Sequence, residues 1–92
     1  MNRGPTARLA LRLALPLDEA EQHFRTGLEW CERERCPVEA GRNLQGLAEV
    51  AQRRGDHTLA MEHLDRAGEL FAQYGAKLYL DEVLAKKQLL GA

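Results

Sequence analysis

The sequence contains no serine, and only five of its 92 side chains are aromatic. Its three threonines, at positions 6, 26 and 58, share no motif with the base and the orienting group that nucleophilic catalysis requires. The eight glycines are dispersed along the chain, so there is no glycine-rich phosphate loop. A chain of this length also buries too little surface to enclose a deep cleft. These absences predict a protein that is not an enzyme and has no catalytic residues.

Neither sign of charge is in clear excess, because the chain has 13 Lys and Arg residues and 14 Asp and Glu residues. A protein that binds nucleic acid needs a basic surface that follows the phosphate backbone, and this balance offers none. No apolar run approaches the roughly 20 residues that a membrane-spanning helix needs. We therefore expect neither nucleic-acid nor membrane partners.

The segment 1–17 carries three arginines and no acid and is otherwise rich in Leu and Ala, a composition that a targeting segment can have. Against that interpretation, Arg12 interrupts the apolar run and Pro16 leads directly into a helical pattern. The two cysteines are too few for the disulfide framework of a small secreted domain. We therefore expect these residues to belong to the folded domain and the protein to be cytoplasmic.

The potential metal ligands lack the spacing of a metal site. Cys31 and Cys36 have no second pair of ligands, and His57 and His63 are six residues apart, which places them on different faces of a helix. Only a fold that brings these groups together with His23 could change this interpretation. We expect reduced cysteines, no metal and no cofactor.

The apolar residues are mostly Leu and Ala, and they recur at spacings of three and four between prolines and glycines, as is typical of helices. The pattern predicts an all-α fold of about five helices, over residues 6–14, 17–33, 37–54, 57–74 and 76–90. Pro16 and Pro37 fit the first turn of a helix, and Gly55 fits the turn after one. Asp56 is expected to cap the following helix.

An internal repeat has a spacing of forty residues: Ala20, Phe24, Gly27 and Leu28 recur as Ala60, Leu64, Ala67 and Gly68. The order of large and small residues from Leu44 to Ala67, with Gly55 and Asp56 between the two helices, resembles the tetratricopeptide repeat (TPR) family. The segment from His63 to Ala92 is similar to C-terminal repeat segments of large bacterial signalling proteins and transcription regulators. In the TPR family, small residues lie where two antiparallel helices cross closely.

The resemblance implies one domain over residues 1–92, built from antiparallel helical hairpins. Residues 1–16 would form a short, atypical first helix, 17–36 the second helix of hairpin 1, 37–74 a complete second hairpin, and 75–92 a closing helix. Members of the family bind other proteins along the first helix of each hairpin. The residues on that stripe, which we expect to form a partner-binding groove, are Arg42, Gln45, Glu49, Gln52 and Arg53.

We expect the protein to be a non-catalytic module for protein–protein interaction or self-association. About three repeats are normally needed to cover their apolar faces, and this chain has fewer, so a homodimer is the expected form. Trp30 is either a boundary packing residue or an interface anchor. The residues expected at the self-association interface are Leu9, Leu11, Leu13, Leu80, Val83 and Leu84. The alternatives are a ligand-sensing regulatory fragment of a larger bacterial signalling protein and, third, a small metal-dependent enzyme.

The first prediction concerns the cysteines and metals. If Cys31 and Cys36 are reduced and no metal holds the fold, a chelator and a reductant should each leave the helical circular dichroism spectrum unchanged. Loss of helical signal with either reagent would contradict this expectation.

Overall fold

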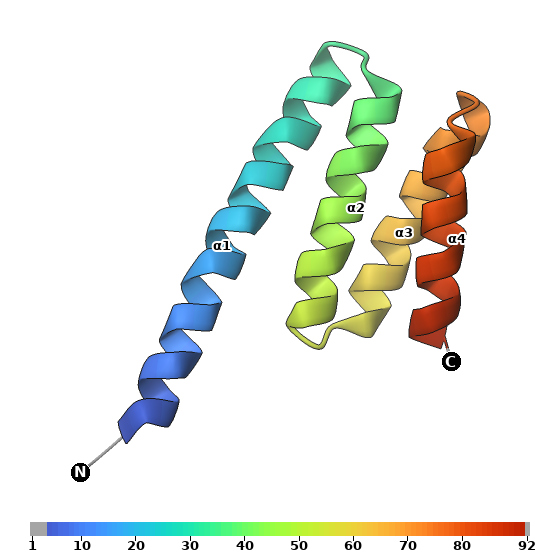
Figure 1. Ribbon diagram of the computed structural model, residues 1–92. Coiled ribbons are helices and arrows are strands. Elements are labelled where there is room, and N and C mark those ends of the chain that lie inside the picture. The colour runs from blue at the N-terminus through green and yellow to red at the C-terminus, as the bar shows by residue number, and fades with distance from the viewer. Residues whose placement is uncertain (1–3, 92) are drawn as a thin grey trace.

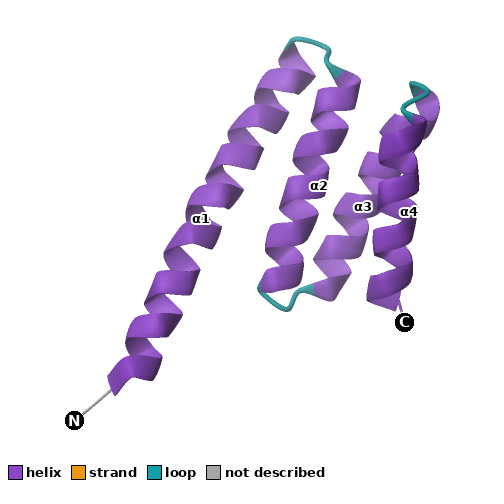
Figure 2. Cartoon of the chain, in the orientation of Figure 1, coloured by secondary structure: helices purple, strands orange, loops and turns teal. Residues whose placement is uncertain are grey.

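Residues 4–91 form four α-helices joined by three short turns (Figures 1 and 2). The computed structural model describes residues 4–91, with side chains from residue 16 onward. The helices are α1 (Gly4–Arg33), α2 (Pro37–Arg53), α3 (His57–Gln73) and α4 (Lys77–Gly91). Each helix packs against the next one in the chain, as in consecutive antiparallel hairpins, and residues 4–91 contain no strand. The predicted all-α fold of helical hairpins is therefore confirmed.

The number of helices differs from the prediction, because the helices expected over residues 6–14 and 17–33 are one continuous helix. α1 runs through Pro16 without a break. A proline inside a helix leaves the carbonyl four residues earlier without its amide partner, but it does not by itself supply a turn. Leu and Ala flank Pro16 and favour the helix on both sides, and no glycine that could end the helix lies between Gly4 and Gly27. The first half of α1 consequently projects beyond the ends of α2 and α3 (Figure 1).

The three turns recur at a constant spacing along the chain and share one device. A residue with positive φ ends each helix: Arg35 (57°), Gly55 (83°) and Gly75 (70°). In each turn, an amide one residue further on donates to a carbonyl in the last turn of the preceding helix, which satisfies a group that the helix leaves unpaired. These bonds are Cys36 N to Cys31 O (2.9 Å), Asp56 N to Ala51 O (2.9 Å) and Ala76 N to Phe71 O (2.8 Å).

Two of the predicted helix signals are confirmed. The Asp56 carboxylate accepts a hydrogen bond from the Leu59 amide at 3.0 Å and so caps α3. Pro37 is the first residue of α2, where its missing N–H costs no helical hydrogen bond. Cys36 precedes it at the N-cap without a side-chain hydrogen bond to the helix. The starts of α2 and α3 therefore lie where Pro37 and Asp56 predict.

The core lies between α2, α3 and α4. The predicted buried residues of α2 and α3 are confirmed for Leu44, Leu47, Ala48, Ala51, Ala60, Leu64, Ala67 and Phe71, whereas Val38 and Leu70 are only partly buried. Glycines let large rings approach the backbone of α2. A methyl group at Gly41 would lie 2.5 Å from the Phe71 ring, and one at Gly46 would lie 2.5 Å from the Phe24 ring. Both contacts require glycine, so they fix how α1 and α3 sit against α2.

The turn device generates a prediction about stability. Arg35 is an L-residue in the left-handed region, so Arg35→Gly should raise the free energy of unfolding by about 1 kcal/mol. Gly55→Ala, the matched control, should lower it by about 1 kcal/mol because alanine is strained at this φ. Urea unfolding monitored by circular dichroism measures both changes. A less stable Arg35→Gly variant would show that the turn is not governed by backbone conformation.

Candidate functional site

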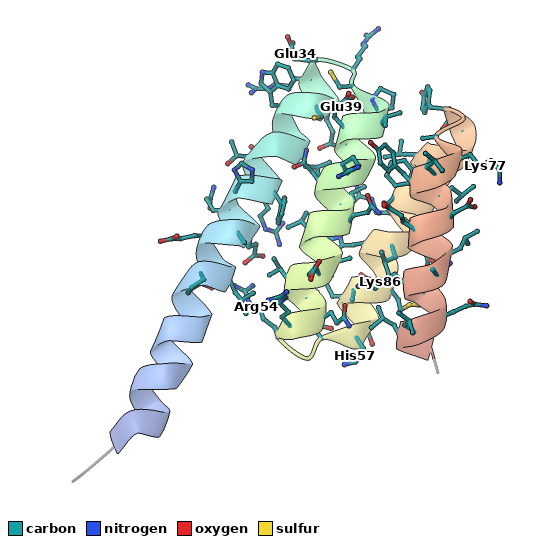
Figure 3. All side chains as sticks on the ribbon, viewed as in Figure 1. Glu34, Glu39, Arg54, His57, Lys77 and Lys86 are labelled. Atoms are coloured by element: carbon teal, nitrogen blue, oxygen red, sulfur yellow. The ribbon has the colours of Figure 1, made fainter. Side chains whose placement is uncertain are left out.

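A groove lies between α2 and α4 and has a volume of about 270 Å³. Ala48 and Leu64 contribute to its apolar lining. Its other lining residues are Gln45, Glu49 and Gln52 from α2 and Glu82, Lys86 and Leu90 from α4. Lys86 lies on the side of α4 that faces α2 (Figure 3). The turns at Gly55 and Gly75 reverse the chain twice, so α2 and α4 both pack against α3 and line this groove together.

Two polar contacts join α2 to α4 beside this groove. Gln45 Nε2 donates a hydrogen bond to Glu82 Oε1 at 3.3 Å. The Arg42 guanidinium carbon lies 4.2 Å from the centre of the Tyr79 ring, which is the geometry of a cation–π contact. These contacts link α2 to α4, and the groove stays open beside them.

The structure brings together most of the residues that the sequence placed in a partner-binding groove. Gln45, Glu49 and Gln52 line it directly. Arg53 pairs with Glu49 at 3.1 Å, and both side chains are more than half exposed, so Arg53 is placed at the outer edge. Arg42 does not line the groove, and its guanidinium group lies over the Tyr79 ring.

Sequence reasoning missed the contribution of α4. Glu82, Lys86 and Leu90 are spaced four residues apart, so they share one face of the last helix. That spacing was available in the sequence. Which face of α4 meets α2 depends on the packing of α3, which the spacing does not show.

The residues expected at a self-association interface fall into different environments. Val83 is fully buried against α3, where a methyl group at Gly68 would lie 3.4 Å from its side chain, so it packs within the chain. Leu80 is partly buried, and Leu84 is 50% exposed. Leu9, Leu11 and Leu13 belong to the projecting half of α1, and their side chains lie outside the described ones.

Other large apolar side chains are exposed, among them Trp30, which the sequence analysis named as a boundary packing residue or an interface anchor. Leu78 is 79% exposed and Leu89 is 72% exposed, and both lie on the outward side of α4 with Ala85. Trp30 on α1 is 52% exposed.

A second hollow, of about 610 Å³, lies between α1, α2 and α3. Both cysteines line it, together with Glu32, Arg35, Arg66 and Glu69, so no sign of charge dominates. Both thiols are free, and burial raises the pKa of the Cys31 thiol, whose sulfur accepts a hydrogen bond from Asn43 Nδ2 at 3.6 Å. Within the described residues, no group of three or more His, Cys, Asp or Glu side chains could hold a metal ion.

An ion-pair cluster fastens α1 to the end of α2. Arg54 binds Asp18 and also Glu21, the latter at 2.7 Å, and it points from the end of α2 toward α1 (Figure 3). Glu21 pairs as well with Arg25 at 2.8 Å. The hydrogen bonds from Arg54 and Arg25 hold the pKa of the Glu21 carboxyl below its usual value. The cluster marks where the packed half of α1 begins.

His63 on α3 is the one buried polar side chain among residues 16–91, with 8% of its surface exposed. Its Nδ1 atom has no hydrogen-bond partner among the described groups. Burial lowers the pKa of this imidazole, and the positive charges of Arg66 and Arg25 lower it further, against the smaller opposite effects of Glu62 and Glu21. The surroundings of His63 therefore favour its neutral form over its charged form.

No protein-family model, curated protein or solved structure matches this chain. The resemblance to the TPR family consequently stays a prediction. In the part of the chain that the structure describes, no helix is long and apolar enough to cross a membrane.

His63 leads to a prediction of pH-dependent stability. Because the pKa of His63 is lower in the folded state, the unfolded state binds the proton more readily. The stability that depends on neutral His63 is therefore fully present above the unfolded pKa of about 6.5 and is lost as the pH falls below it. Between pH 7.5 and 5.5 the loss from this residue cannot exceed about 1.4 kcal/mol per pH unit. Urea unfolding at both pH values should show a smaller decrease for His63→Leu than for the wild type. The control His57→Gln, at an exposed position, should keep the full decrease, and an undiminished decrease in His63→Leu would contradict the assignment.

Proposed function

We propose that the protein is a non-catalytic interaction module that binds a protein partner in the groove between α2 and α4. The observation that carries the proposal is the convergence of Gln45, Glu49 and Gln52 with the Lys86 and Leu90 side chains of a second helix around one groove. Apolar residues at the base and hydrogen-bonding groups at the sides are the composition that protein interfaces use. A volume of about 270 Å³ accommodates a few side chains of a partner rather than a whole cofactor.

Self-association is the second part of this proposal. The exposed Trp30, Leu78 and Leu89 side chains support it, as does the projecting half of α1, which no other described helix covers. Two-fold pairing covers the same patch on both copies, which makes a homodimer the simplest assembly for such a chain.

The groove is tested in two steps, of which the first identifies its partner. A photoreactive side chain at position 52, inside the groove, should yield a protein adduct in cells. The same group at position 62, exposed on α3 outside the groove, is the control. Adducts of equal yield at both positions would show that the groove does not direct binding.

The second step measures the affinity of the purified partner. Lys86→Glu reverses a charge in the groove and should weaken binding at least about tenfold, which corresponds to about 1.4 kcal/mol. Lys77→Glu is the matched control, because Lys77 lies on the same helix outside the groove and its side chain is 83% exposed. Titration calorimetry distinguishes the two. Equal affinities for Lys86→Glu and Lys77→Glu would contradict the proposal.

A further inference from the structure

The regular spacing of the three turns predicts a further turn near the N-terminus, and that turn is absent. Residues with positive φ end helices at 35, 55 and 75, and one further step of the same length toward the N-terminus leads to Leu15. A leucine rarely adopts that conformation, and Pro16 occupies the position where the second turn has the capping residue Asp56. The chain therefore does not turn here, and residues 4–16 continue α1 in a straight line (Figure 1).

The missing turn leaves one face of α1 uncovered. The packed half of α1 contacts α2 through Phe24, Gly27 and Leu28. A second stripe, formed by Glu19, His23, Thr26 and Trp30 at spacings of four, three and four, is exposed along its whole length. A helix over residues 4–14 would cover this stripe if the chain folded back at Leu15.

We propose that residues 4–16 of a second copy of this chain cover the stripe, in a reciprocal exchange that forms a homodimer. This inference rests on the self-association part of the proposed function. Each copy supplies the helix that the other lacks, so the hairpin that the missing turn prevents within one chain forms between two chains. Exchange of an identical element is a common route to dimers when a hinge cannot close.

The contacts between α1 and α2 give the register of this pairing. Phe24 lies against Gly46 and Gly27 against Asn43. Both of these pairs can be shifted toward the N-terminus by the number of residues that separates successive turns. The shifted pairs place Gly4 of one copy opposite Thr26 of the other, and Ala7 opposite His23. Arg12 is then at the level of Asp18 and Glu19 of the other copy.

The charges along α1 favour the same antiparallel arrangement. Its first half, residues 4–17, carries Arg8 and Arg12 and no acid. Its second half carries two bases and five acids: Asp18, Glu19, Glu21, Glu29 and Glu32. Asp18 and Glu21 already bind Arg54, whereas Glu19 and Glu29 have no ion pair among the side chains that the structure describes. Two antiparallel copies of α1 set each basic half against an acidic half, and the two helix dipoles then oppose each other.

The solution masses of the wild type and of a variant changed at residues 15 and 16 test the exchange. At tens of micromolar the wild-type chain should sediment as a dimer of twice 10.4 kDa. Leu15→Gly combined with Pro16→Asp installs the pair that makes the turn at Gly55 and Asp56, so this variant should fold back on itself and sediment as a monomer with unchanged helical content. A monomeric wild type would overturn the proposal, whether it stays in solution or instead binds vesicles of anionic lipid through its basic segment.

Disulfide trapping tests the register independently of the mass. In a background with both native cysteines replaced by alanine, Ala7→Cys with His23→Cys should form a disulfide between two chains when Leu15 and Pro16 are kept. When Leu15→Gly and Pro16→Asp are added, the same pair should form a disulfide within one chain. Ala7→Cys with Glu62→Cys on α3 is the control and should not cross-link. A wild-type dimer in which the first pair fails to form bonds between chains would overturn the exchange.

The outcomes separate the exchange from the broader proposal. A dimer that is unaffected by Leu15→Gly with Pro16→Asp but is dissociated by Leu78→Asp or Leu89→Asp would preserve self-association and move the interface to α4. The partner-binding groove is tested by Lys86→Glu and does not depend on either result.

Discussion

The structure depends on where the backbone can enter the left-handed region. Arg35, Gly55 and Gly75 each end a helix at a positive φ, and an amide-to-carbonyl bond closes each turn. These evenly spaced turns give three antiparallel pairs of neighbouring helices and so create the core and the α2–α4 groove. At Leu15 the same device is absent, so α1 continues, and no other helix of residues 4–91 lies beside its first half.

Close packing then fixes the helices that the turns bring together. Gly41 and Gly46 admit the rings of Phe71 and Phe24 to the backbone of α2, so α2 is held on both sides by contacts that a larger residue would disrupt. Arg54 adds an ion-pair cluster at the end of the packed half of α1. The fold therefore has a firmly packed part and a projecting helical segment, and these two parts carry the two halves of the proposed function.

The sequence predicted those features that depend on local chemistry. Gly55, Asp56 and Pro37 determine helix ends by their own conformations and hydrogen bonds, and the periodic spacing of residues such as Leu44 and Leu64 identifies the buried faces of α2 and α3. Features that depend on packing between helices were not predicted. Pro16 was interpreted as a helix start because its pattern fits a first turn equally well, and Val83 was assigned to an interface because its burial depends on how α4 meets α3. The groove was predicted from α2 alone, since the position of α4 follows from the tertiary fold.

The central claim is that the chain passes straight through Leu15 and Pro16. Spin labels at Thr6 and Thr26, measured by pulsed electron paramagnetic resonance in an excess of unlabelled chain, report the distance within a single chain. A continuous helix separates these positions by about 30 Å, at about 1.5 Å per residue. The account predicts this long distance. A distance of about 10 Å, the usual separation of two packed helices, would show that residues 4–16 fold back on their own chain and would contradict it.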